Sequence, residues 1–292
     1  MSEREAGPLV SGEWLAACIG EPGLHVIHVS TDRKAYDEGH LPGAIFSDLH
    51  VDLAKAGTRS ETGAAKRVYL VPTREETAES LARWGVAAGD HVVFYDDSQG
   101  RQAIRGYWLL RLYRFPKEQL HVLDGGLPVW AKDGRALTKV EPEADAADPA
   151  VALALLGNRV DSLIATADDV LALSREASAP NGPTRLLDVR RIDEFLGRDV
   201  LARRGGHIPG ARHRLFTEFI AADGRMRPAA DMLSVLKGSG VDPAELRATY
   251  CQGGVRAALA WFALSEVAGL TQVRNYAESW EEWGNRPDVP IE

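Results

Sequence analysis

The sequence predicts an α/β protein of two similar domains in tandem, each a mainly parallel sheet flanked by helices. The first observation is a repeat, because HLPGA at 40–44 returns as HIPGA at 207–211. The second is that the segments around the two copies follow in the same order in both halves of the chain. The third is that short apolar strand-like runs alternate with helical stretches, which is typical of parallel sheets because their strands need long crossover connections.

In the first half, the apolar run LHVIHVS at 24–30 precedes the pentapeptide and predicts a strand. A second strand is expected at HVVFYDD (91–97), followed by a tight loop and an apolar helix over 104–112. VLDGGLPVW at 122–130 predicts a further strand that runs into a turn and ends on a tryptophan.

The second half contains the same parts. RLLDVR at 185–190 corresponds to the first strand, and LRATYCQ at 246–252 to the second. An apolar helix is expected over 257–267, and VRNYAESWEEW at 273–283 again predicts a strand, a turn and a closing tryptophan. The second domain is therefore expected to have the architecture of the first.

The stretch between the halves has a different composition. KVEPEADAADPA at 139–150, with the short apolar patch that follows, has too little sustained periodicity for a long element. We interpret 138–161 as a linker, which gives a first domain at 1–137 and a second at 162–292.

Composition restricts the class of protein. The chain has 292 residues, 45% of them hydrophobic, and a net charge of -8, so it offers no general basic footprint for nucleic acid or an anionic membrane. Two cysteines in so long a chain suit a reducing compartment. The first ten residues have no apolar core of a signal peptide and no apolar run could span a bilayer, so we expect a cytoplasmic protein.

Cys251 is the residue with the strongest chemical context. It ends a predicted strand and is followed by two glycines and by Arg256, which opens a helix. A loop at a helix N-terminus directs several backbone N–H groups at one point, which favours an anion such as a thiolate or persulfide. The alternative is a buried structural cysteine, which is the role we expect for Cys18 in its apolar-patterned stretch.

These pieces together resemble the tandem-domain rhodanese and mercaptopyruvate sulfurtransferase family, over nearly the whole chain. The segments that carry the resemblance are LLDVR (186–190), EFLG (194–197), GHIPGA (206–211), YCQGGVRA (250–257), VLDGGLPVW (122–130) and SWEEWGNRPDVPIE (279–292).

The resemblance implies an active-site loop of six residues that begins with the catalytic cysteine: Cys251, Gln252, Gly253, Gly254, Val255 and Arg256. It implies double displacement, in which Cys251 takes a sulfur from a donor as a persulfide and passes it to cyanide or a thiol. The partners would be small donors and acceptors, with a thiol protein such as thioredoxin as a further candidate acceptor. No cofactor is expected, and no metal, because no histidine or cysteine pair has ligand spacing. Asp96 stands where the repeat calls for a cysteine, so the first domain should be catalytically silent.

Arginines are the candidates for binding an anionic donor. Arg190 ends its predicted strand at the sheet edge where α/β proteins place ligands, although an ion pair with Asp188 or Glu194 would explain it equally well. Arg198 is a second candidate, in a basic stretch that a solvated surface would also explain. For Arg256 we prefer a loop-stabilising role over contact with the anion. For His40 and His207 we prefer structural hydrogen bonds over acid–base chemistry.

The donor stays open between thiosulfate and 3-mercaptopyruvate, with a preference for thiosulfate. Gly253 and Arg256 stand where the mammalian mercaptopyruvate branch has serine and threonine, and Glu194 stands where it has arginine. A serine-based proton relay is therefore absent, and a donor-carboxylate contact at Glu194 is in doubt. The loop also lacks the two cationic residues of the vertebrate thiosulfate enzymes, because Gln252 and Gly253 are neutral.

Two other functions are compatible with parts of the sequence. A cysteine-dependent phosphatase shares the topology but needs a loop one residue longer, so the cradle here should suit a smaller sulfur-centred group. A sulfur-relay or interaction module without turnover of a free donor is the other alternative, against which the retained Cys251 and its glycines argue.

Overall fold

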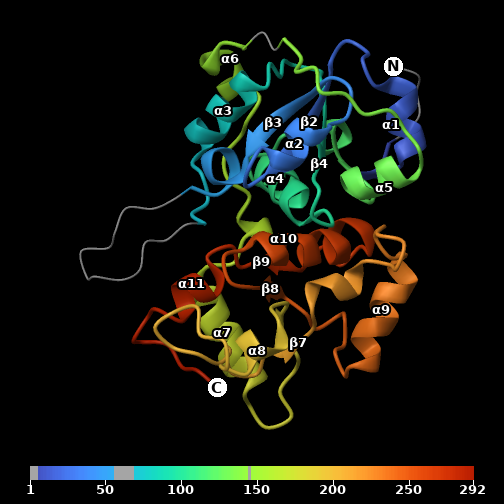
Figure 1. Ribbon diagram of the computed structural model, residues 1–292. Coiled ribbons are helices and arrows are strands. Elements are labelled where there is room, and N and C mark those ends of the chain that lie inside the picture. Colours follow the sequence, from blue (N-terminus) through green and yellow to red (C-terminus); the bar gives the residue numbers. More distant parts are fainter. Residues whose placement is uncertain (1–5, 56–68, 144–145) are drawn as a thin grey trace. The chain divides into compact units, whose positions relative to one another are not determined.

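The computed structural model describes residues 6–55, 69–143 and 146–292, and these form two compact units. The first unit comprises 6–55, 71–160 and 222–226, and the second comprises 161–221 and 227–292 together with Tyr69 and Leu70. Each unit has a parallel sheet with helices around it, so the predicted α/β class is confirmed (Figure 1). The limits proposed for the domains and the linker stay a prediction.

The sheet of the first unit has the strand order β1-β5-β4-β2-β3, and all four pairings are parallel. Its strands are β1 (Leu9–Val10), β2 (Leu24–Ser30), β3 (Ala44–Asp48), β4 (His91–Tyr95) and β5 (Leu120–Leu123). Because every connection returns to the same end of the sheet, the loops after the strands gather at one edge. The loop after β4, which begins with Asp96, lies at that edge.

Helices accompany the sheet of the first unit. They are α1 (Gly12–Cys18), α2 (Lys34–Glu38), α3 (Arg74–Arg83), α4 (Arg101–Leu112), α5 (Gly126–Lys132) and α6 (Pro149–Ala154), with short turns η1 (Leu49–Leu53) and η2 (Lys117–Gln119). Helix α3 begins with a capping box in which Thr73 and Glu76 each accept the other's backbone N–H. None of the helices in the described residues is both long and apolar enough to cross a bilayer.

The second unit repeats this plan with the parallel order β7-β6-β8-β9. Its strands are β6 (Leu186–Asp188), β7 (Arg212–His213), β8 (Ala248–Tyr250) and β9 (Arg274–Asn275). Its helices are α7 (Ala167–Ala177), α8 (Ile192–Phe195), α9 (Ala229–Gly238), α10 (Val255–Trp261) and α11 (Ser279–Trp283), with η3 (Asp161–Leu163), η4 (Phe216–Phe219) and η5 (Phe262–Val267). Helix α10 runs directly into η5, and together they cover the apolar helix predicted at 257–267.

The repeat extends to individual side chains. His40 stacks on Tyr36 at 3.8 Å between ring centroids and His207 stacks on Phe195 at 3.7 Å, and each histidine Nδ1 lies within hydrogen-bond distance of the carbonyl of the residue it stacks on. The last tyrosine of each central strand also accepts the backbone N–H that follows the repeated histidine. Both histidines are thus engaged in structural contacts, the role preferred for them.

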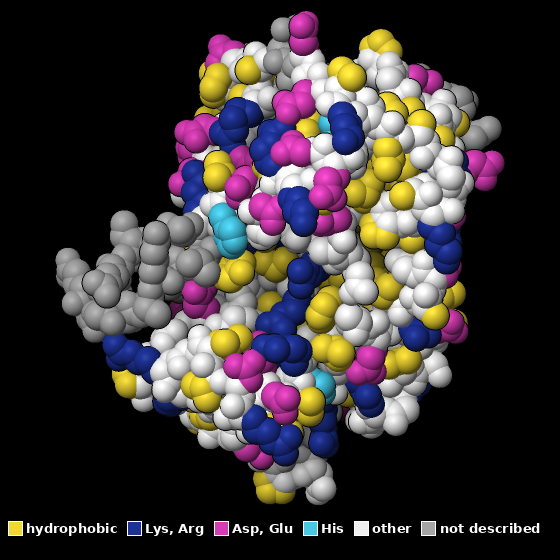
Figure 2. All heavy atoms as spheres, in the orientation of Figure 1, with side chains coloured by type: hydrophobic (Ala, Val, Ile, Leu, Met, Phe, Trp, Pro, Cys, Tyr) yellow, Lys and Arg dark blue, Asp and Glu magenta, His cyan; other side chains and the backbone are white. Residues whose placement is uncertain are grey.

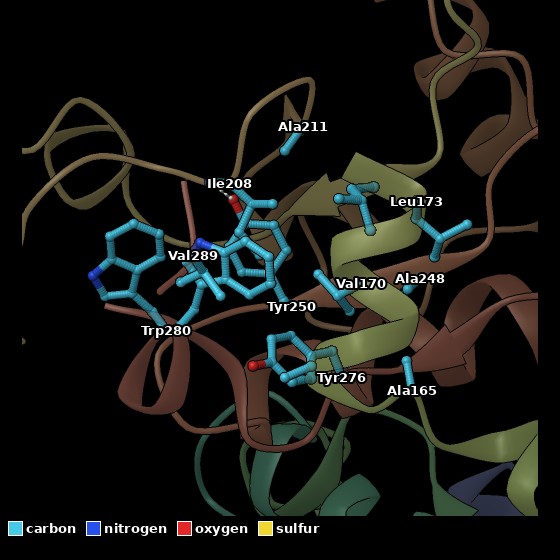
Figure 3. Packing of buried hydrophobic residues seen from close by; sticks show 13 residues of the cluster. Ala165, Val170, Leu173, Ile208, Ala211, Ala248, Tyr250, Tyr276, Trp280 and Val289 are labelled. Carbon is cyan, nitrogen blue, oxygen red and sulfur yellow. Dashed lines mark hydrogen bonds between the residues drawn. The ribbon is translucent and has the colours of Figure 1, made fainter. Parts of the chain in front are cut away.

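The core of the second unit fixes the end of β8. Tyr250 is fully buried, and Figure 3 shows it among Ile208, Val289 and Trp280, with Val170 of α7 nearby. Burying large aromatic side chains of this kind contributes roughly 1.5–3 kcal/mol each, so this part of the sheet is firmly held. The residue that follows Tyr250 is Cys251, whose starting position is therefore set by the core.

The segment expected as a linker is more ordered than its composition suggested, although residues 144–145 lie outside the described part. Thr138 forms a backbone bridge with His40, and 149–154 form α6, which packs against α3. The guanidinium of Arg74 donates to the carbonyls of Leu153 and Leu156 at the end of α6. These long-range contacts order a stretch that lacks sustained periodicity of its own.

Charges of both signs are mixed over the surface. On the face drawn in Figure 2, Lys and Arg side chains are interspersed with Asp and Glu. Surface pairs such as Arg185–Glu176 at 2.9 Å and Arg225–Asp133 at 2.8 Å bring opposite charges together. A surface of mixed charge does not favour anions over a wide area, so a single loop is the better candidate for an anion site.

Candidate active site

Cys251 lies directly after β8, at the carboxyl edge of the second sheet. The residue is 1% exposed, and its Sγ accepts the backbone N–H of Gly254 at 3.2 Å. Gly254 is the N-cap of α10, so the sulfur lies at the positive end of a helix that continues into η5. The loop thus curls around the sulfur in the way that stabilises a thiolate.

The two loop glycines are required for different reasons. Gly254 has a φ of +78°, and a Cβ there would lie 2.2 Å from the carbonyl oxygen of Ala277. Gly253 has no such backbone requirement, but a Cβ on it would lie 2.3 Å from Cδ2 of Tyr69. Gly254 is needed for the turn, whereas Gly253 makes room for a neighbouring ring.

The start of α11 forms hydrogen bonds with the backbone of the Cys251 loop. Ser279 accepts the backbone N–H of Cys251 at 3.0 Å and donates its hydroxyl to the carbonyl of Tyr276 at 2.7 Å. Trp280 and Glu281 donate their backbone N–H groups to the carbonyls of Cys251 and Gln252, at 3.0 and 2.8 Å. Ser279 is fully buried with a φ of +52°, a strained conformation for serine that these bonds maintain.

Arg256 forms a two-pronged ion pair with Glu194 of α8. Its Nη1 and Nη2 lie 2.7 and 2.8 Å from the two carboxylate oxygens, and Arg191 donates to the same carboxylate from its Nε at 2.9 Å. Burial opposes the charge on Glu194, but the hydrogen bonds and charge of Arg256, with those of Arg191, outweigh it and lower the pKa of Glu194 to about 2. This geometry supports the loop-stabilising role of Arg256.

Arg256 also interacts electrostatically with Cys251. Burial works against its charged form, yet Glu194 and the nearby Cys251 raise the pKa of its guanidinium above the ordinary value. Contact of Arg256 with a bound donor stays a prediction.

Arg190 is enclosed within the second unit. It is 1% exposed, donates to both oxygens of Asp188, and donates from Nη2 to the carbonyl of Gly206 at 2.7 Å. Its guanidinium also lies 4.4 Å from the ring of Trp280. The structure therefore has the Asp188 ion pair that was the alternative interpretation, and substrate binding by Arg190 stays a prediction.

Three further arginines of the second unit have partners of their own. The Arg198 side chain is 69% exposed and pairs with Asp193 at 3.3 Å, while Arg214 pairs with Glu218 at the same distance. Arg204 donates to backbone carbonyls of the C-terminal segment, including that of Val289 at 3.0 Å. These contacts explain the arginines as structural residues, and substrate binding by Arg198 also stays a prediction.

Cys18 differs from Cys251 in its surroundings. It is half-buried in α1 and donates its Sγ–H to the carbonyl of Trp14 at 3.2 Å. Burial, and then the charge of Glu21, raise the pKa of this thiol. The thiol form is favoured there, which agrees with a packing role.

In the first unit an aspartate occupies the equivalent of the sulfur site. The Asp96 carboxylate accepts the backbone N–H groups of Ser98, Gly100 and Gln102, each at 2.8 Å, and that of Ala103 at 3.0 Å. The anion cradle at the start of α4 is therefore filled by the chain itself. This supports the prediction that the first domain is catalytically silent.

The buried ion pair of the second unit has no equivalent in the first. His28 pairs with Tyr95 across the sheet as Asp188 pairs with Tyr250, and Ser30 follows His28 where Arg190 follows Asp188. His28 is fully buried, and neither of its ring nitrogens has a hydrogen-bond partner within the described part of the chain. Burial lowers the pKa of His28 to about 4, against the opposing charge of Asp97.

Several of these contacts were not predicted from the sequence. Ser279 and Trp280 lie in a segment that served only to indicate the family, and Tyr69 had no predicted role. Glu194 was predicted as a candidate partner of Arg190 and as a departure from relatives, but not as the partner of Arg256. Glu194 could have been found, because an acid three residues after Arg191 at a helix start suggests a capping interaction. No local signal marks Ser279 or Tyr69, because their partners are distant in sequence.

Comparisons with known proteins agree with the geometry. A family model described as a rhodanese-like domain matches twice, at 11–133 and 166–286. The thiosulfate sulfurtransferase of Corynebacterium glutamicum is 34% identical over 97% of this chain and 90% of its own length. A probable 3-mercaptopyruvate sulfurtransferase of Pseudomonas aeruginosa is 35% identical over 97% of both chains.

Solved structures share the fold. The crystal structure of SseA from Escherichia coli, described as a 3-mercaptopyruvate sulfotransferase, has a TM-score of 0.75 at 24% identity, over 94% of this chain and 99% of that one. EanB has a TM-score of 0.78 at 24% identity, over 98% of this chain and 69% of that one. With a family match in each half of the repeat and relatives above 30% identity over nearly its whole length, the chain belongs to the tandem-domain rhodanese family of sulfurtransferases.

Proposed function

We propose that this enzyme transfers a sulfane sulfur from a small anionic donor to a nucleophilic acceptor through a persulfide on Cys251. The observation that carries the proposal is the position of Sγ, which accepts the Gly254 N–H at the start of α10. A helix N-terminus stabilises an anion at this point, and both the thiolate and the persulfide are anions.

The first half-reaction consumes the donor. The Cys251 thiolate attacks the outer sulfur of thiosulfate, a new S–S bond forms, and the donor's own S–S bond breaks so that sulfite leaves with the electron pair. With 3-mercaptopyruvate the C–S bond breaks instead, and the pyruvate enolate leaves and takes a proton. The Cys251 persulfide carries its negative charge on the terminal sulfur, where N–H groups of the loop can stabilise it.

The second half-reaction restores the enzyme. Cyanide or a thiolate attacks the terminal sulfur, takes it, and leaves the electron pair of the S–S bond on Cys251 as thiolate. Net oxidation does not occur, because the sulfur atom moves at the same oxidation level. Ping-pong kinetics are the expected signature.

Thiosulfate is the preferred donor and 3-mercaptopyruvate the alternative, since relatives named for each are about equally similar to this chain. The preference rests on Glu194, a buried acid engaged with Arg256 at a position where the carboxylate of a mercaptopyruvate donor would need a cation. Thiosulfate needs no such partner at its reacting sulfur.

We further propose that the enzyme works in the cytoplasm with a small thiol, or a thiol protein such as thioredoxin, as its acceptor. Cys18 and Cys251 are both free thiols, as a reducing compartment requires. A thiol kept reduced in the same compartment could take the sulfur from Cys251.

The test is thiocyanate formation from cyanide with each donor, in the wild type and in Cys251→Ser. We expect turnover with at least one donor, loss of it in the variant, and a mass increase of one sulfur atom on the donor-treated wild type. Folded protein that gains no sulfur from either donor would contradict the proposal. Cys251-dependent hydrolysis of an aryl phosphate would instead favour the phosphatase alternative.

A further inference from the structure

We infer that Tyr69 forms one wall of the Cys251 site and limits the size of the sulfur acceptor. This inference rests on the proposed persulfide chemistry and adds a residue that determines acceptor specificity. Tyr69 belongs to the second unit by its contacts, although its neighbours in sequence from residue 71 onward belong to the first.

The contact between Tyr69 and Gly253 is unusually close. A Cβ on Gly253 would lie 2.3 Å from Cδ2, 2.5 Å from Cγ and 2.8 Å from Cβ of Tyr69. These are atoms at the base of the tyrosine side chain, so the ring cannot avoid an added methyl group by moving only its outer end. Tyr69 therefore lies directly against the Cα of Gly253, and Gly253 is buried.

Gly253 is part of the anion cradle. It lies between Cys251 and Gly254, the residue whose N–H reaches the sulfur. Consecutive Cα atoms are about 3.8 Å apart, so the Cα of Gly253, on which the ring packs, lies within about 7.6 Å of the Cys251 Cα. An aromatic ring in this position takes up space beside the loop that an acceptor attacking the terminal sulfur would otherwise use.

The size of the ring suggests what it excludes. Cyanide is linear and two atoms long, whereas glutathione approaches with a peptide attached to its thiol. A rigid ring against the cradle should hinder the second far more than the first, because fixed walls discriminate by steric exclusion. The hydroxyl group of Tyr69 plays no part in this argument, which concerns only the ring.

The test compares acceptors on an enzyme that already carries the sulfur. Cys251 is converted to the persulfide with polysulfide in a Cys18→Ser background, which leaves it as the only thiol of the chain. The rates of sulfur transfer to cyanide and to glutathione are then measured for the wild type, Tyr69→Ala and Tyr69→Phe. Loading with polysulfide makes the test independent of whether thiosulfate or 3-mercaptopyruvate is a donor.

We expect Tyr69→Ala to raise the glutathione-to-cyanide ratio of second-order rate constants about tenfold, a typical effect of a changed pocket wall. Tyr69→Phe keeps the ring and should leave the ratio within about twofold of the wild type. An unchanged ratio in Tyr69→Ala would overturn the inference, as would a ratio that rises equally in Tyr69→Phe.

A second pair of variants tests the contact itself. Gly253→Ala alone should reduce transfer to cyanide about 5- to 150-fold, the equivalent of the 1–3 kcal/mol typical of overpacking. Combining it with Tyr69→Ala should recover most of the loss. That substitution removes the ring atoms at 2.3 and 2.5 Å and leaves only the Cβ of residue 69, at 2.8 Å, in contact with the added methyl group. Additive effects in the double variant would show that Tyr69 does not press on the loop. If the proposed donor reaction fails, the coupling between Tyr69 and Gly253 can still be measured by comparing the thermal unfolding of the wild type, the two single variants and the double variant.

Discussion

At Glu194 a carboxylate is held almost completely out of water, at 1% exposure, between two arginines that neutralise it. A buried pair of this kind contributes little net stability against an apolar alternative, but removing one partner leaves an unpaired charge and is costly. The pair is thus better understood as fixing the position of Arg256 beside the catalytic loop.

Replacement of Glu194 by Gln should lower the free energy of unfolding at pH 7 by about 3–5 kcal/mol, because Arg256 loses a charged partner. The pKa of Glu194 is lowered to about 2 from 4.5 in the folded state, so its contribution is present above pH 4.5 and is lost as the pH falls toward 2. Urea unfolding at pH 7 and pH 3 would measure this. The difference between variant and wild type should shrink at pH 3, and an exposed-site control, Glu118→Gln, should change neither value.

His28→Leu should make the protein less sensitive to acid, in a higher pH range than the one in which Glu194 acts. The folded pKa of His28 is lowered to about 4 from 6.5, so the unfolded chain binds its proton first and stability is lost as the pH falls from about 6.5 to 4. Leucine has a similar volume and cannot take up a proton. Thermal unfolding at pH 7 and pH 5 should show a smaller loss for the variant, and an equal loss in both proteins would refute the assignment.

At the scale of elements, the site is the junction of β8 with α10, supported by the start of α11. The strand sets where Cys251 begins, the helix supplies the N–H groups and the dipole, and Ser279 with Trp280 holds the backbone of the loop. A strand-loop-helix unit of this type could be predicted from the sequence, because glycines between an apolar strand and an apolar helix indicate it directly. The support from α11 depends on how distant elements pack, which no local pattern encodes.

Gly254→Ala should disrupt this junction, and Gly269→Ala is its matched control. Both glycines have a φ of +78°, but a Cβ on Gly254 would meet the backbone of Ala277 at 2.2 Å, whereas nothing lies within 4 Å of one on Gly269. We expect Gly269→Ala to cost about 1 kcal/mol of stability and to leave transfer unchanged. Gly254→Ala should cost more and reduce thiocyanate formation at least about 100-fold, since the loop loses its shape. Equal effects of the two variants would show that backbone strain alone is responsible.

At the scale of the whole molecule, the chain contains two copies of one architecture, with Cys251 in one loop and Asp96 in the equivalent loop. The repeat in sequence was enough to predict two parallel α/β units and to place Cys251 and Asp96 at equivalent loops. It could not decide which partner Arg190 takes, because Asp188 and Glu194 are both close in sequence and only tertiary packing separates them. Tyr69 and Ser279 could not be assigned for a similar reason, since each contacts the loop from a distant segment.

The double variant Cys251→Ser/Asp96→Cys should have no sulfurtransferase activity. The first loop lacks consecutive glycines, and from Asp96 to the capping Gly100 it has one residue more than the second loop has from Cys251 to Gly254. It is shaped around a carboxylate that accepts four N–H groups, and a thiolate cannot reach both pairs of donors. Thiocyanate formation by the double variant above the Cys251→Ser background would show that the first loop is catalytically competent after all.

The short stretch 222–226 belongs by its contacts to the first unit, where the backbone N–H of Met226 donates to Asp124 at 2.8 Å and Arg225 pairs with Asp133. Burial raises the pKa of Asp124, and Met226 and then Arg225 oppose that rise, so the acid depends on partners encoded about a hundred residues later. During synthesis, a ribosome that has released only the first half of the chain has not yet supplied them. No single cut in the polypeptide therefore yields a first unit with all of its contacts, and a split version of this enzyme would have to supply that pentapeptide separately.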